Sequence, residues 1–172
     1  MTLSPPVRKG VLAVHLAVSV GWVGAVLAYL SLGLAATRSR DPHTVRGAWI
    51  AMEVMGWYAL VPLALSSLVT GVILSLGSKW GLLRHYWVVV SFLLTTVAAV
   101  VLVLHMPTVS STAARARAST DETLFTLGGD LFHASLALVL LLAVQVLNIY
   151  KPAGVTPYGW RRQHRPHPAV AR

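Results

Sequence analysis

Histidine is the side chain in this sequence best suited to chemistry inside a membrane. The chain has seven histidines and no cysteines, which excludes disulfides, thiolate metal sites and cysteine nucleophiles. His15, His105 and His133 fall within long uncharged stretches. Ionisable groups in a bilayer are expensive and are therefore candidates for a functional site. A buried imidazole can ligate a metal or haem iron, relay protons, or only hydrogen-bond a neighbouring helix.

The expected depths of these histidines limit which of them can share a ligand. His15 lies near one membrane surface, whereas His105 and His133 lie near the other. Helices joined by a loop are commonly antiparallel neighbours, so His105 and His133 are expected to face each other. A haem site would then use His105 with His133, or His15 alone or with His85. Asp130, just before His133, is expected to orient that ring.

A second group of side chains on the side of His105 suits copper. Glu53 and Met106 are expected there, together with His105 and His133. Imidazole and thioether ligands both bind copper, and thioethers favour Cu(I). Copper transport or handling is therefore an alternative to haem. A cofactor-free membrane scaffold or accessory subunit, whose histidines only join helices, is a third reading.

Transmembrane helices must position these residues. Of the 172 residues, 56% are hydrophobic and 11% are charged, whereas a soluble domain has about 25% charged residues. The apolar stretches are continuous, unlike the alternating strands of a membrane barrel. Each is long enough to cross a hydrocarbon core of about 30 Å as a helix. They span residues 10–36, 54–77, 86–114 and 131–150.

The sequence therefore predicts an all-α integral membrane four-helix bundle with antiparallel up-down-up-down topology. Its helices are expected at residues 7–36, 45–77, 83–106 and 128–151, within one domain over residues 1–152. Pro62 is expected to kink the second helix. Pro107 is expected to end the third, which leaves a mobile loop after it. Residues 153–172 are expected to form a basic cytoplasmic tail with little fixed structure.

Two stripes at helical spacing are expected to face the bundle interior. The first helix presents one polar and aromatic stripe, and the long second helix presents another. The first stripe is His15, Ser19, Trp22, Val26 and Tyr29, and the second is Glu53, Trp57, Leu60, Ala64, Ser67 and Gly71.

The charges predict the orientation. Most of the fourteen cations lie in the N-terminal segment, the second loop and the tail, whereas all five acids lie on the other side. The positive-inside rule then places both termini in the cytoplasm, with the lipid bilayer as the principal partner. No folded basic domain with interleaved aromatic residues is present, so no nucleic-acid partner is expected. The tail is instead expected to touch anionic lipid headgroups.

The stretch from His15 to Gly24, with Trp22 between them, resembles the H-x6-W-x-G opening helix of the CopD and HemJ-type membrane proteins. Residues 75–88 and 150–152 resemble a bacterial family of predicted integral membrane proteins of unknown function. HemJ-type proteins bind haem b through a first-helix histidine, which corresponds to His15. They oxidise protoporphyrinogen and pair that histidine with a deeper lysine, which this chain lacks between Lys9 and Lys79. Enzyme activity is therefore left open, and the resemblance to CopD implies copper.

The leading expectation is a bacterial inner-membrane protein that binds haem b. It would exchange electrons with a quinone-like partner or another membrane redox protein. The candidate iron ligands are His15, His105 and His133, with Trp22 and Asp130 beside the cofactor.

Overall fold

The computed structural model describes residues 3–78, 81–128 and 131–163. The described elements are almost entirely helical, and four helical rods are long and apolar enough to cross a membrane. The predicted all-α four-helix fold is confirmed, and the protein is a multi-pass membrane protein. In chain order the elements are α1 (Pro5–Arg38), α2 (Pro42–Met55), the π-helical turn η1 (Gly56–Leu60), α3 (Val61–Leu76), α4 (Tyr86–Ala118), α5 (Asp121–Leu124), α6 (Leu131–Tyr150) and α7 (Pro157–Gln163).

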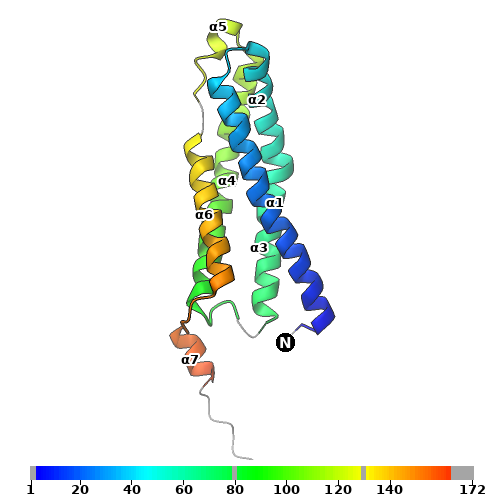
Figure 1. Ribbon diagram of the computed structural model, residues 1–172, viewed down its shortest axis with the longest axis vertical. Coiled ribbons are helices and arrows are strands. Elements are labelled where there is room, and N and C mark those ends of the chain that lie inside the picture. The colour runs from blue at the N-terminus through cyan, green and yellow to red at the C-terminus, as the bar shows by residue number, and fades with distance from the viewer. Residues whose placement is uncertain (1–2, 79–80, 129–130, 164–172) are drawn as a thin grey trace, which may run out of the picture.

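The four rods are α1, the continuous α2–η1–α3, α4 and α6, and neighbours along the chain are antiparallel (Figure 1). Both α1 and α4 pack against α2, α3 and α6. The N-terminus and α7 lie at one end, here called the α7 end, and the opposite end is the α5 end (Figure 1). Helix α6 has 20 residues, about the number needed to cross the hydrocarbon core. Because α1 and α4 have 34 and 33 residues, they and α2 project past α6 at the α5 end (Figure 1).

A π turn corrects the predicted inner face of the second rod. η1 (Gly56–Leu60) ends two residues before Pro62, whose ring would clash with the Tyr58 carbonyl in a regular α-helix. The wider turn adds one residue to the helix, so the face predicted to include Glu53 and Trp57 is out of register there, and Trp57 is exposed. The buried face instead runs through Val45, Ala48, Trp49, Met52, Gly56, Leu60, Ala64 and Ser67.

Helix α4 does not end at Pro107, as the sequence predicted, but continues to Ala118. Much of the expected loop after Pro107 is therefore helical. Pro107 itself is exposed, and an interior proline costs a helix about 3 kcal/mol. The packing of the extension on α2 compensates for this cost. The buried residues of α4 on both sides of Pro107 recur at helical spacing: Met106, Val109, Thr112, Ala113 and Ala116.

The predicted tail is also ordered over the part that the structure describes. Val155 pairs with His85 in an antiparallel β-bridge, and the Thr156 backbone N–H donates to the Arg84 carbonyl at 2.9 Å. Helix α7 follows directly. Residues 153–163, here called the C-terminal clasp, are therefore docked on the segment that leads into α4.

Candidate ligand-binding cavity

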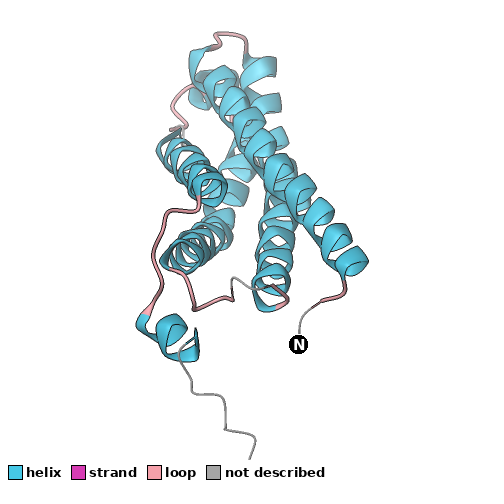
Figure 2. Cartoon of the chain, turned by 60° about the horizontal axis from the view of Figure 1, so that its bottom comes forward, coloured by secondary structure: helices cyan, strands magenta, loops and turns pink. Residues whose placement is uncertain are grey.

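A cavity of about 620 Å³ lies between α1, α3, α4 and α6 in the α7 half of the bundle. This volume falls in the range of pockets that hold small molecules and cofactors. Figure 2 shows the α7 end of the bundle, with the N-terminus on one side and α7 on the other. Arg8, Lys9 and Lys151 line its mouth, and most of its wall is apolar. The polar residues of the interior wall are His15, Ser19, Ser67, Ser75, Ser91, Thr95, Gln145 and Asn148.

The hydrogen bonds around His15 favour one tautomer of its ring. Its Nδ1 lies 2.9 Å from the Thr70 Oγ1 atom. The Thr70 hydroxyl donates its single hydrogen to the backbone of its own helix, with the Ser66 carbonyl oxygen at 2.7 Å. When the Thr70 hydroxyl donates to this carbonyl, its oxygen accepts from His15 and Nδ1 carries the proton. The neutral ring then has its lone pair on Nε2, which is the arrangement required for ligation through that nitrogen.

The position of the His15 ring depends on a glycine and on a second polar pair. A Cβ atom at Gly71 would lie 3.3 Å from His15 Cε1, so the absence of a side chain there leaves space for the imidazole. One turn further along α1, the Ser19 and Ser67 hydroxyl oxygens are 2.9 Å apart. Both pairs join α1 to α3 and fix this wall of the cavity.

Trp22 lies at the inner end of the same wall. It lines the cavity and is buried, as are Val26 and Tyr29 further along α1. The predicted inward stripe of the first helix is therefore confirmed: its polar part borders the cavity and its apolar part belongs to the core.

The α4–α6 side of the cavity carries hydroxyl and amide groups. Ser91 is buried, and its hydroxyl donates to the Asn148 Oδ1 atom at 3.2 Å. Thr95 and Gln145 border the cavity on the same side. This side therefore offers neutral hydrogen-bonding groups and lies across from the imidazole of His15.

His105 and His133 face each other, as predicted, but their rings are stacked. The ring centroids are 4.5 Å apart and the planes differ by 24°. Two axial ligands approach one haem iron end-on from opposite faces of the porphyrin, so stacked rings do not have that geometry. In the described part of the chain, the cavity lining includes His15 but not His85, His105 or His133. Asp130 lies outside the described residues.

The residues of the copper alternative have other contacts. Met106 is buried in the core, and a Cβ atom at Gly56 would lie 2.8 Å from its sulfur. Glu53 forms an ion pair with Arg117, with 2.6 Å between Oε2 and the guanidinium nitrogen. Among the described residues, no group of three or more His, Asp or Glu side chains is placed to hold a metal ion.

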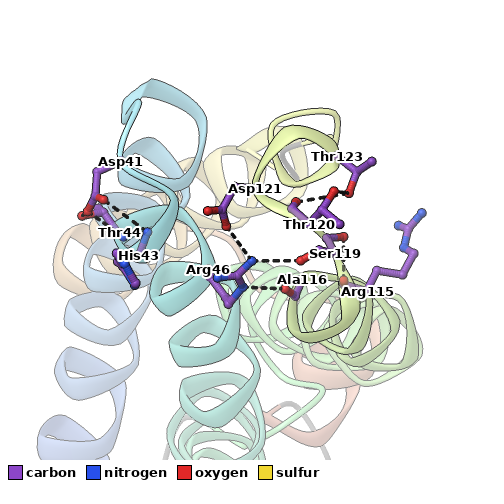
Figure 3. A network of polar contacts seen from close by, with 10 residues as sticks. All are labelled: Asp41, His43, Thr44, Arg46, Arg115, Ala116, Ser119, Thr120, Asp121 and Thr123. Atoms are coloured by element: carbon purple, nitrogen blue, oxygen red, sulfur yellow. Dashed lines mark hydrogen bonds and ion pairs between the residues drawn. The ribbon is translucent and has the colours of Figure 1, made fainter.

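The α5 end has a polar network that the sequence analysis missed (Figure 3). The Arg46 guanidinium donates to the backbone carbonyls of Ala116 and Ser119 at 3.0 and 2.9 Å. It also pairs with Asp121 at 3.1 Å. A cation at the carbonyl end of a helix is favourable because those carbonyls have no partner within the helix. Arg46 of α2 therefore caps α4 and joins it to α5.

Asp41 caps the start of α2 at this end. Its carboxylate accepts from the Thr44 hydroxyl and from the backbone N–H groups of Thr44 and His43. These hydrogen bonds, above all that from the Thr44 hydroxyl, lower the pKa of Asp41 below its usual value. The cap is therefore strongest while Asp41 is ionised.

No protein-family model matches the chain, and no curated protein or solved structure matches it either. The resemblance to CopD and HemJ-type proteins stays a prediction.

Proposed function

We propose that this protein binds haem b in the cavity at the α7 end, with His15 as an axial ligand of the iron. In this proposal it transfers electrons with a quinone-like partner or another redox protein in a bacterial inner membrane. The observation that carries the proposal is the position of His15 on the wall of a large apolar cavity whose mouth is cationic.

The cavity residues fit the chemistry of haem b. The cofactor has a broad apolar ring and two carboxylates at one edge. Apolar side chains of all four helices would contact the ring, and Trp22 would close its inner end. Arg8, Lys9 and Lys151 would pair with the carboxylates at the mouth. His15 would ligate through Nε2 with its proton on Nδ1, the tautomer that the hydrogen bonds of Thr70 favour.

Bound haem b supplies one-electron chemistry. The residues of the chain set its environment. The hydrogen bond to Thr70 fixes the orientation of the His15 ring and increases its basicity as a ligand. The apolar wall limits access by water, which influences the reduction potential.

The proposed orientation has both termini in the cytoplasm. It is supported by the positive-inside rule, because nine of the fourteen cations in the sequence, and none of its five acids, fall in the N-terminal segment, the second loop and the tail. The cavity mouth would then open toward the cytoplasmic surface.

The visible spectrum of the purified protein tests the proposal. The full chain is expressed with a haem precursor, purified in mild detergent and recorded before and after dithionite reduction. We expect a Soret band and sharp α and β bands that His15→Ala removes. His133→Ala is the matched control and should leave the bands unchanged, because His133 does not line the cavity. A wild-type spectrum without these bands, or bands lost only in His133→Ala, would contradict the proposal.

A further inference from the structure

The C-terminal clasp (residues 153–163) is held by backbone hydrogen bonds to the segment that leads into α4. The Tyr86 backbone N–H donates to the Gly154 carbonyl at 3.3 Å, and that of Thr156 donates to the Arg84 carbonyl at 2.9 Å. The Thr156 hydroxyl donates to the Leu83 carbonyl and accepts from the Gly159 N–H at 3.1 Å. Thr156 therefore caps α7 and attaches it to the bundle.

Gly159 makes this docking close. A Cβ atom there would lie 2.5 Å from the Arg84 carbonyl oxygen and 3.1 Å from its carbonyl carbon. Backbone atoms cannot turn aside as the end of a side chain can. Any larger residue at this position must therefore separate α7 from the segment before α4.

The docked clasp exposes aromatic and cationic side chains just past the end of α6. Tyr158 is 52% and Trp160 is 58% exposed, and Arg161 beside them is also exposed. Tyr150 and Lys151, at the end of α6, are exposed as well. Helix α6 has about the number of residues needed to cross the hydrocarbon core, so a surface just past its end would lie at the depth of the lipid headgroups.

We propose that the C-terminal clasp is an interfacial anchor that binds anionic glycerophospholipid headgroups. Tryptophan and tyrosine favour the membrane–water interface, where an apolar ring and a polar group can both be accommodated. Arg161 complements the negative charge of the headgroups, and a cation near such a surface contributes favourably to binding. The docking by Thr156 and Gly159 holds these side chains on one rigid surface.

A spin label measures the depth of the clasp in the membrane. The chain has no cysteine, so Tyr158→Cys can carry a single nitroxide in nanodiscs of phosphatidylcholine with phosphatidylglycerol. We expect the label at headgroup depth, and we expect Gly159→Ala in the same chain to move it into water. Gly10→Ala is the control, because a Cβ there meets nothing within 4 Å. A label at Tyr158→Cys as exposed to an aqueous relaxant as one at Phe125→Cys would overturn the proposal.

Native mass spectrometry with added lipid then measures headgroup preference in the unlabelled full chain. We expect Trp160→Ser/Arg161→Gln to lower the affinity for phosphatidylglycerol about fivefold and to change phosphatidylcholine binding less. The control, Phe125→Ser/Arg40→Gln, removes an exposed aromatic residue and a cation at the α5 end. Equal losses in the two double variants, or equal losses for the two lipids, would show that the clasp is no anionic-lipid site.

Discussion

The polar side chains at the two ends of the bundle are arranged differently. At the α5 end, charged side chains pair with one another and with helix termini, as Arg46 does with α4 and Asp121. At the α7 end, the helices leave a cavity of about 620 Å³ whose wall carries an imidazole, hydroxyls and amides. At the α5 end the polar groups join helix ends to one another, whereas at the α7 end they line a cavity that the proposed function fills with a ligand.

This difference suggests that the α5 end contributes mainly to stability and that the α7 end carries the proposed function. The α5 end projects past α6 (Figure 1), so its ion pairs sit where water lowers the cost of charge. The α7 end places neutral polar groups between transmembrane helices, where each must have a partner or a ligand. Changes at the α5 end should therefore alter stability, and changes at the α7 end should alter ligand binding.

Among changes that keep His15, the largest expected effect comes from filling the cavity beside it. Gly71→Leu places a side chain against His15 and takes volume from the cavity. We expect haem affinity to fall about a hundredfold, comparable to the loss of a metal site's supporting contacts, with little change in helicity. Gly24→Leu on α1 is the control, since a Cβ there meets nothing within 4 Å. Absorbance titration with haem measures the affinity of both variants. Equal haem affinities of Gly71→Leu and Gly24→Leu would contradict the proposed site beside His15.

A large effect on stability is expected at the other end. Arg46→Ala removes the cap of α4 and its link to α5, and hydrogen bonds from a charged group are worth about 2 kcal/mol. We expect the free energy of unfolding to fall by about that amount, measured by denaturation in mixed micelles, with haem binding unchanged. Arg40→Ala, at an exposed position, should cost no more than about 0.5 kcal/mol. Loss of haem binding in Arg46→Ala would show that the α5 end also influences ligand binding at the α7 end.

A smaller effect is expected at the mouth of the cavity. Replacing Arg8, Lys9 and Lys151 together by glutamine removes the charges proposed to hold carboxylates. Exposed ion pairs contribute little singly, so we expect about a tenfold loss of haem affinity for the three together. The loss should shrink in high salt. The control Arg38→Gln/Arg40→Gln at the α5 end should leave the haem affinity unchanged. An equal loss of affinity in this control would show that the effect comes from the net charge of the protein and not from the mouth of the cavity.

The smallest effect concerns pH at the α5 end. Because the pKa of Asp41 is lowered in the folded protein, the ionised cap stabilises the fold at neutral pH. That contribution is lost as the pH falls through the lowered value. We expect the difference in melting temperature between wild type and Asp41→Asn to be present at about pH 7 and to shrink toward about pH 3. A difference that does not depend on pH would contradict this role of the carboxylate.

Local composition was enough to predict the four membrane-spanning rods and the inward stripe of the first helix. Continuous apolar runs specify spanning helices, and the spacing of His15, Trp22 and Tyr29 specifies one helical face. The prediction that His105 and His133 face each other also followed from the antiparallel packing of two helices joined by a loop. Their stacking and the cavity did not, because both depend on how whole helices pack.

The errors arose where tertiary packing outweighed a local rule. Pro107 does not end α4, because the packing against α2 continues on both sides of it, a pattern visible in the spacing from Val109 to Ala116. The π turn before Pro62 shifted the second stripe by one residue, which no fixed helical period can anticipate. The clasp did have a local signal that was overlooked: Thr156 followed by Pro157 is a typical start of a helix.

Titration of the haem-free protein in nanodiscs with haem b tests the central claim most directly. The Soret absorbance of wild type, His15→Ala and His105→Ala is followed to saturation. The account predicts one haem per chain for wild type and for His105→Ala, and no saturable binding for His15→Ala. The same saturable binding in His15→Ala as in wild type would contradict the claim that the cavity at the α7 end ligates haem through His15.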